Sequence, residues 1–172
     1  RLTEVWALIP FLYMVMIAIS LIPADLKLFS RIAVLLLIMV VFSWTGLATY
    51  LRTATFKEKT RDYVAAASLL GASNLRMIFR HVLPNTLSTL VTFLPFTVMA
   101  SISALNALDY LSFGLPPPTP SWGDLLHEGV GQLNAPWIVL SAFGAITFVL
   151  LLVAFIGEAI RGLSDARELS PR

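Results

Sequence analysis

The sequence of 172 residues has no cysteine, few charged residues and only two histidines. Without cysteine, the chain forms neither a disulfide framework nor a thiolate metal site. The two histidines, His81 and His127, are far apart in sequence, which disfavours a zinc or haem site. Charged residues make up 13 % of the chain, compared with roughly 25 % in soluble globular domains. These shortages argue against a soluble globular protein.

The chain does contain four long apolar stretches, and no charged side chain lies in any of them. A helix needs roughly 20 mostly apolar residues to cross the hydrocarbon core of a bilayer. Pro10 and Pro95 lie inside two of the stretches, which favours a bundle whose neighbouring helices satisfy the freed carbonyl groups. The sequence therefore predicts an all-α, polytopic membrane protein with four spans, at about 5–22, 32–51, 87–108 and 138–156.

The placement of lysine and arginine predicts which loops face the cytoplasm. Six of these residues lie in the stretch 52–86 and none lies in 109–136. By the positive-inside rule, the loop 52–86 and the tail 158–172 are cytoplasmic, and the loop 109–136 is periplasmic. Lys27 and Arg31, between the first two spans, weaken this bias without reversing it.

Several chemical activities have no residues to carry them. Carriers driven by protons or ions commonly bury charged groups within their spans, so the uncharged spans disfavour a secondary carrier or channel, which stays the alternative. The chain has no GxxxxGK[ST] phosphate-binding motif. The spans also lack the paired carboxylates or Ser/His arrangement that catalysis needs. We expect no catalytic, cofactor or metal site and no enzyme activity.

The segment 62–85 is polar and rich in alanine, unlike the stretches on either side. Gly71 is suited to end a helix in the left-handed conformation, and Ser73 to cap the helix that follows. The residue before a proline is pushed out of the helical region, so Pro84 is expected to end this second helix. The sequence predicts two short helices with a bend near Gly71.

The second of these helices is amphipathic. Its apolar face follows the i, i+3, i+4, i+7 spacing and consists of Leu75, Ile78, Phe79 and Val82. Ser73, Arg76, Met77 and Arg80 lie on the other face, with His81 at the border. Two interpretations fit this pattern equally well. Either the helix lies in the lipid headgroups, or its apolar face packs on the membrane domain and its polar face meets a soluble partner.

The sequence of this segment resembles the EAA loop of ABC importer permeases, in its peptide-importer form. The resemblance is carried by Ala65-Ala66-Ala67-x-x-x-Gly71 and by Arg80-His81-Val82-Leu83-Pro84-Asn85. Ala65 stands where many members have glutamate, so no salt bridge is expected there. The resemblance implies a coupling loop that docks in a groove of a separate ATPase subunit, through Ala66, Ala67, Gly71, Ser73, Arg76, Met77, Arg80, His81 and Pro84.

A second motif, on the other side of the membrane, supports the same family. The run Leu108-Asp109-Tyr110-Leu111-Ser112-Phe113-Gly114-Leu115-Pro116-Pro117, with Trp122-Gly123 after it, is similar to the external loop of oligopeptide and dipeptide permeases, closest to the Yej-type permeases of microcin C and oligopeptide importers. The prolines make the loop stiff, so it is either a rigid cap or a gate near the solute-binding protein. The gate residues expected are Phe113, Gly114, Pro117, Trp122 and Gly123.

The resemblance implies a type I ABC importer transmembrane domain in the bacterial inner membrane. Members have about six spans, so four spans suggest an N-terminally truncated fragment. The implied partners are cytosolic ATPase subunits that bind the ATP, a second permease subunit in a heterodimer, a periplasmic or lipid-anchored solute-binding protein and the lipid bilayer, without nucleic acid. The implied cargo is a peptide or peptide-like compound. Candidate path-lining residues are Ser43, Ser101, Ser103 and Asn106.

Overall fold

The structure is a computed structural model that describes residues 2–23, 25–132 and 134–169, and every regular element among these residues is helical. Three segments are long and apolar enough to cross a membrane: Leu28–Lys59, Leu90–Tyr110 and Pro136–Gly162. The predicted all-α membrane fold is confirmed. The elements are α1 (Leu2–Ala7), α2 (Phe11–Ser20), α3 (Leu28–Lys59), α4 (Asp62–Leu69), α5 (Asn74–Met77), the π-helix η1 (Ile78–Val82), α6 (Leu83–Tyr110), α7 (Trp122–Gly131) and α8 (Pro136–Leu169).

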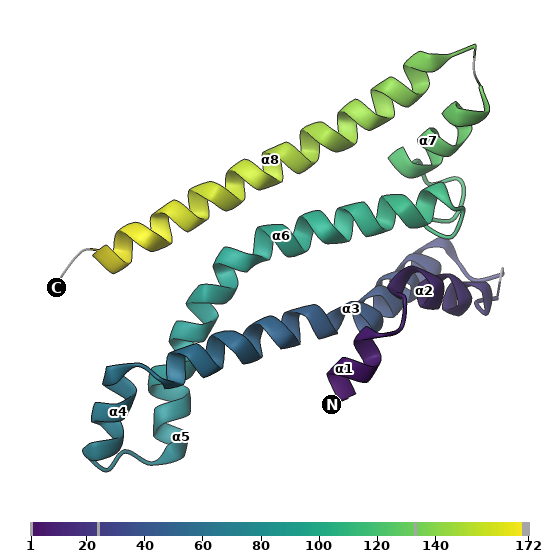
Figure 1. The fold of residues 1–172 in the computed structure, drawn as a ribbon. Helices are drawn as coiled ribbons and strands as arrows, with labels where there is room; N and C mark the ends of the chain where they lie inside the picture. The colour runs from purple at the N-terminus through teal and green to yellow at the C-terminus, as the bar shows by residue number, and fades with distance from the viewer. Residues whose placement is uncertain (1, 24, 133, 170–172) are drawn as a thin grey trace.

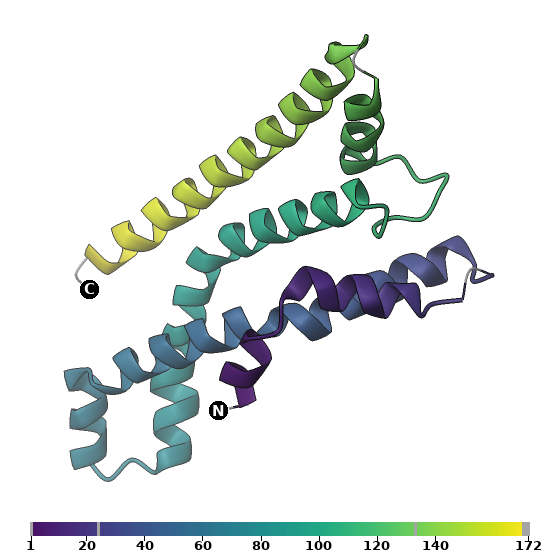
Figure 2. The ribbon, with the colours of Figure 1, turned by 45° about the vertical axis from the view of Figure 1, so that its right-hand side comes forward.

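The three long helices lie side by side, with α6 between α3 and α8 (Figures 1 and 2). The turn formed by α4 and α5 lies at one end of the bundle, together with the C-terminal end of α8. Helix α7 and the connection between α2 and α3 lie at the opposite end. This arrangement agrees with the predicted alternation, in which 52–86 and 109–136 face opposite sides.

The first predicted span, 5–22, needs correction, because the structure divides it into two helices at Pro10. Proline has no amide hydrogen, and its ring pushes the preceding residue out of the helical region. Pro10 itself is extended, with ψ of 113°, and precedes the first residue of α2. At 10 residues, α2 is about 15 Å long and too short to cross the hydrocarbon core. It packs instead against α3.

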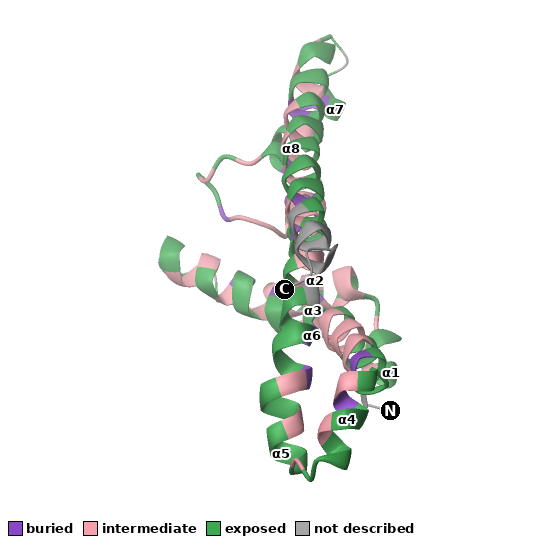
Figure 3. Cartoon of the chain, turned by 90° about the vertical axis from the view of Figure 1, so that its left-hand side faces the viewer, coloured by how far each residue is buried: buried purple, intermediate pink, exposed green. Residues whose placement is uncertain are grey.

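The best-packed part of the described chain lies where α2, α3 and α6 meet. Its buried residues are Val15, Leu35, Met39 and Leu108. Elsewhere the large apolar side chains of the three long helices are mostly exposed, as the predominance of exposed residues along α6 and α8 shows (Figure 3). Extensive exposed apolar surface is typical of a face that meets lipid or another subunit.

Helix α6 touches each of the other two long helices through a specific contact. The ring of Phe93 stacks on Tyr50 of α3, with ring centroids 4.1 Å apart. Pro95 lies inside α6, which is bent (Figure 1), and proline is a common cause of such bends. Gly157 of α8 lies against this proline, since a Cβ at Gly157 would be only 2.7 Å from the Cβ of Pro95.

The two ends of the last predicted span also differ from expectation. The predicted loop 109–136 contains a helix, α7, which packs against both α6 and α8. Ser121 caps α7, because its hydroxyl oxygen accepts a hydrogen bond of 3.1 Å from the amide of Asp124. The predicted tail 158–172 continues α8 as far as Leu169, and residues 170–172 lie outside the described residues.

Candidate functional site

Residues 60–82, here called the elbow, join α3 to α6 as a pair of short helices. Helix α4 ends in a Schellman motif: the amide of Ala72 donates to the carbonyl of Ala67 at 3.1 Å, and that of Gly71 to Ser68 at 3.0 Å. Gly71 has a φ of +78°, which favours glycine. The sequence thus ends α4 where the motif needs a left-handed residue, and the predicted bend at Gly71 is confirmed.

The helix after the bend begins as predicted and ends differently. Ser73 caps α5 by accepting a hydrogen bond of 3.4 Å from the amide of Arg76, which confirms the predicted cap. Pro84 does not end the helix, because α5, η1 and α6 follow one another without a break. A proline ring clashes with the carbonyl four residues earlier, here that of Arg80. The π-helix η1 covers that position, and its wider turn accommodates the proline.

The apolar face expected to pack on the membrane domain is largely uncovered. Only Val82 is buried, at 4 % exposure, and the other three residues are exposed: Leu75, Ile78 and Phe79. Met77, expected on the partner-facing side, is half-buried. Within this helix, η1 has contacts with α3 and α6, whereas the main contacts of α5 are with α4 and with η1, its own continuation. The predicted orientation of this helix is therefore corrected.

Three leucines around the bend, Leu69, Leu70 and Leu75, form what we call the apolar tip. Leu69 and Leu70 are 90 % and 89 % exposed, and Leu75 is 69 % exposed. The turn that joins α4 to α5 lies on the side of the elbow away from α8 (Figures 1 and 2). Of the other predicted coupling residues, Ala66, Arg76 and Arg80 are exposed and Ala67 is half-buried. The elbow thus presents apolar side chains at its turn, with two arginines on the following helix.

Polar side chains from three helices meet where the elbow joins the bundle. We call Glu58, Arg61, Tyr63 and Asn85, with the carbonyl of His81, the base cluster. The Tyr63 hydroxyl donates a short hydrogen bond to Glu58, and Arg61 Nε lies 3.2 Å from the other carboxylate oxygen. The Asn85 amide donates to the Tyr63 oxygen at 2.7 Å and to the His81 carbonyl at 3.0 Å. His81, a predicted coupling residue, thus contributes its backbone to the cluster.

The environment of Tyr63 keeps its hydroxyl protonated. Burial raises the pKa of Tyr63 above its ordinary value of 10.0, and the hydrogen bond to Glu58 raises it further. A neutral hydroxyl both donates and accepts, which is what its place between a carboxylate and an amide requires. At neutral pH the cluster therefore has a donor for each carboxylate oxygen of Glu58.

At the other end of the bundle, the loop after α6 is also built on a Schellman motif. The amide of Phe113 donates to the carbonyl of Leu108 at 2.8 Å, and that of Ser112 to Asp109 at 2.9 Å. Ser112 takes the left-handed position with a φ of 63°, which is uncommon for serine. The buried carboxylate of Asp109 then accepts a hydrogen bond of 2.6 Å from the amide of Leu115. Asp109 thus holds the loop against the end of α6.

Two predicted gate residues are glycines because the backbone is crowded there. A side chain at Gly114 would overlap the carboxylate of Asp109, and one at Gly123 would overlap the carbonyl of Asn106. Phe113 is half-buried and packs near the core, whereas Pro117 and Trp122 are exposed. The structure therefore places all five predicted gate residues in one folded unit, formed by the loop and α7, with Pro117 and Trp122 exposed.

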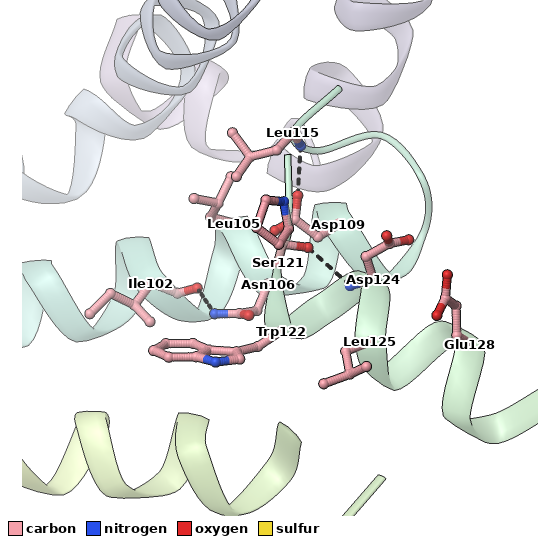
Figure 4. A pocket seen from close by; sticks show the side chains of 11 residues that line it. Ile102, Leu105, Asn106, Asp109, Leu115, Ser121, Trp122, Asp124, Leu125 and Glu128 are labelled. Carbon is pink, nitrogen blue, oxygen red and sulfur yellow. Dashed lines mark hydrogen bonds between the residues drawn. The ribbon is translucent and has the colours of Figure 1, made fainter. Parts of the chain in front are cut away.

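This unit borders an open pocket of about 760 Å³ between α6, α7 and the loop (Figure 4). Its wall combines apolar side chains with three carboxylates, and it includes Ile102, Leu105, Asn106, Asp109, Leu115, Trp122, Asp124, Leu125 and Glu128. Asn106, a predicted path-lining residue, bonds to the carbonyl of Ile102 at 2.8 Å and borders the pocket. The other predicted path residues, Ser43, Ser101 and Ser103, are exposed on α3 and α6.

Sequence reasoning missed the base cluster and the role of Asp109. Nothing in the local sequence signals that Glu58, Tyr63 and Asn85 meet, since they lie on separate helices. A signal for α7 was present, because Ser121-x-x-Asp124 is a capping pattern that marks the start of a helix. Among the described residues, no group of His, Cys, Asp or Glu is arranged to hold a metal ion.

Long apolar helices with a folded elbow at one end and a capped loop and helix at the other define a polytopic α-helical membrane protein. The chain belongs to the family of inner membrane components of binding-protein-dependent transport systems. The sequence pattern of this family matches residues 1–169. Members are components of the inner membrane, where this chain is placed.

Relatives with assigned roles agree with this family. The chain is 39 % identical to the peptidoglycan transport system permease protein YejE of Agrobacterium fabrum, over 98 % of this chain and 42 % of the relative. It is 39 % identical to the inner membrane ABC transporter permease protein YejE of Escherichia coli, over 96 % of this chain and 47 % of the relative. It is 34 % identical to the oligopeptide permease OppC of Lactococcus lactis, over 98 % of this chain and 56 % of the relative. The chain spans about half the length of the curated relatives it matches.

Proposed function

We propose that this chain belongs to a permease subunit of an ATP-binding-cassette importer that moves peptides or peptide-like compounds across the inner membrane. The permease roles of its relatives, named for peptidoglycan and oligopeptide transport, support this cargo. ATP is bound and hydrolysed by a cytosolic ATPase subunit. A second permease subunit completes the pathway as a heterodimer, and a solute-binding protein delivers cargo at the outer face.

The observation that carries this proposal is the uncovered apolar tip of the elbow. A helix that lies in the headgroups needs an apolar stripe along its length. Such a stripe is present at Leu75, Ile78 and Phe79, but the most exposed leucines, Leu69 and Leu70, lie beyond it, on the other side of the bend. A compact apolar tip on a folded hairpin fits a pocket on a soluble protein better than a flat lipid surface. The elbow is therefore the docking site for the ATPase, with its apolar tip and the exposed Arg76 and Arg80 as the groups available for contact.

At the outer face, the loop and α7 act as the gate that faces the solute-binding protein. The predicted gate residues, from Phe113 to Gly123, are held by Asp109, so the unit moves as one body with the end of α6. Ser101 and Ser103 on α6 and Ser43 on α3 line the path, together with Asn106 at its outer end.

Photo-crosslinking in the complete transporter tests the docking site. A photoreactive residue in place of Leu70 is expected to crosslink to the ATPase subunit. The matched control is Leu8, another leucine with 81 % exposure that lies outside the elbow, where no ATPase crosslink is expected. Crosslinks from Leu70 to lipid alone would contradict ATPase docking. ATP-dependent uptake of labelled di- to hexapeptides into proteoliposomes tests the cargo, and uptake without ATP hydrolysis would instead support a secondary carrier or channel.

A further inference from the structure

We propose that the base cluster is a positioning device that fastens the elbow to α3, so that movement of the elbow reaches α3 and α6 together. Glu58, Tyr63 and Asn85 are its positioning residues. This inference rests on the proposed function, in which an ATPase displaces the elbow. None of the three residues is among those that the sequence marked as coupling residues.

The need for such a device follows from how the elbow is attached. On one side, α5, η1 and α6 run into one another, so the second half of the elbow and α6 form one continuous helix. On the other side, α3 ends at Lys59 and α4 begins at Asp62, and the helical hydrogen bonds are interrupted between them. The chain alone therefore gives a stiff connection to α6 and a hinge to α3.

The base cluster spans this hinge. Glu58 lies in the last turn of α3, Tyr63 in the first turn of α4 and Asn85 in the first turn of α6. The Tyr63 oxygen bonds to both of the other positioning residues: it donates to Glu58 and accepts from Asn85 at 2.7 Å. Removing that oxygen would disconnect α3 from α6 at this point.

The burial of Glu58 supports a positioning role. Its side chain is only 9 % exposed, although a carboxylate is costly to remove from water unless it is paired. Both of its oxygens are paired, one with Tyr63 and the other with Arg61. The Asn85 amide likewise uses its two hydrogens on two acceptors, Tyr63 and the carbonyl of His81. A fully paired polar network fixes one arrangement of the groups that it joins.

The test uses the complete transporter in proteoliposomes and measures peptide transported per ATP hydrolysed. Tyr63→Phe keeps the ring and removes the oxygen, and it is expected to lower this ratio about fivefold, the effect of losing roughly one net hydrogen bond. ATP hydrolysis and the Leu70 crosslink to the ATPase are expected to persist, because the elbow tip is unchanged. Tyr13→Phe is the matched control, since Tyr13 is exposed and lies outside the cluster.

Two further variants separate positioning from folding. Glu58→Gln retains an oxygen that accepts from Tyr63, so it is expected to keep more of the ratio than Glu58→Leu. In a double-mutant cycle, Asn85→Ala is expected to lower the ratio in the parent and to add little in the Tyr63→Phe background, because the shared bond is already lost. Additive effects would show that the two residues act separately and would overturn the proposal.

The outcomes for the two proposals are distinguishable. An unchanged ratio in Tyr63→Phe, while the parent transports peptides, would overturn the positioning role and leave the proposed function standing. A parent that moves no peptide with ATP would overturn the proposed function. Hydrogen exchange then tests the cluster without a transport measurement: Tyr63→Phe is expected to speed exchange of the Arg61 amide, which donates across the hinge to the Glu58 carbonyl at 3.2 Å. Unchanged exchange there would overturn the positioning role as well.

Discussion

Gly71→Ala should loosen the elbow by an amount that follows from its backbone alone. Gly71 has a φ of +78°, and nothing lies within 4 Å of the place where a Cβ would be added. The substitution therefore causes no clash, and its cost is that of a left-handed L-residue, about 1–2 kcal/mol. That cost corresponds to a change of about 5- to 30-fold in the equilibrium between the formed and opened bend.

Hydrogen exchange measures that equilibrium directly. The Ala72 amide donates to the Ala67 carbonyl only while the bend is formed, so its exchange should speed up by about 5- to 30-fold in Gly71→Ala. Membrane insertion should survive, because no span is altered. The matched control is Gly46→Ala, at a helical glycine of α3 that also has nothing within 4 Å, and it should leave Ala72 unchanged.

The reciprocal substitution sharpens the test. Ser112 occupies the same left-handed position at the outer end of α6, with a φ of 63°. Ser112→Gly should relieve strain, partly offset by the greater freedom of glycine in the unfolded chain, and should slow exchange of the Phe113 amide about two- to fivefold. If Gly71→Ala leaves the Ala72 amide as protected as in the parent, the assignment of the bend to a Schellman motif is refuted.

Three other predictions follow from the described contacts. Gly123→Ala should lower the free energy of unfolding of the purified protein by about 1–3 kcal/mol, because the added Cβ would overlap the Asn106 carbonyl. Gly131→Ala in the same helix adds a Cβ that meets nothing within 4 Å, so it should leave the stability unchanged. Equal stability of the two variants in thermal unfolding would contradict the close approach of α7 to α6. The hydroxyl of Tyr63 should ionise above pH 10.0, so stabilisation by the base cluster should be complete below that pH and lost as the pH rises through the raised pKa. Ultraviolet absorbance should show a late-titrating tyrosine that Tyr63→Phe removes, and the same curve in both proteins would argue against the raised pKa. Because the chain has no cysteine, His127→Cys should react with an impermeant maleimide on intact cells and Arg76→Cys only after permeabilisation, and the opposite pattern would reverse the topology.

The sequence predicted those parts of the fold that depend on local composition. Apolar length is a local property, so α3 and α8 were expected close to where they occur. Prolines were treated alike, although their outcomes differ. Pro95 stays within α6, with Gly157 of α8 packed against it, whereas Pro10 separates α1 from α2. Whether a helix continues through a proline depends on its neighbours in space, which a single segment does not contain.

In the candidate site, too, features set by the local sequence were predicted, and features set by distant neighbours were not. Gly71 and Ser73 act on the backbone within a few residues of themselves, so their roles in the bend were predictable. The base cluster was not, because Asn85 and Tyr63 are 22 residues apart and meet only once the elbow has folded back. The orientation of the elbow helix was predicted wrongly because periodicity identifies an apolar face and does not say what covers it.

The stacking of Tyr50 on Phe93 is a contact between α3 and α6 that lies much closer to the elbow end of α3 than to its other end. Tyr50 is nine residues from the elbow end of this helix and 22 from its other end, or about 13 Å and 33 Å at 1.5 Å per residue. A straight rod that turns about such a fulcrum moves its long arm about 2.4 times as far as its short arm. A shift of about 2 Å at the elbow would thus correspond to about 5 Å at the outer face, and the packing of Leu35 and Met39 of α3 against Leu108 of α6 opposes a separation of that size, so α3 and α6 are expected to turn together.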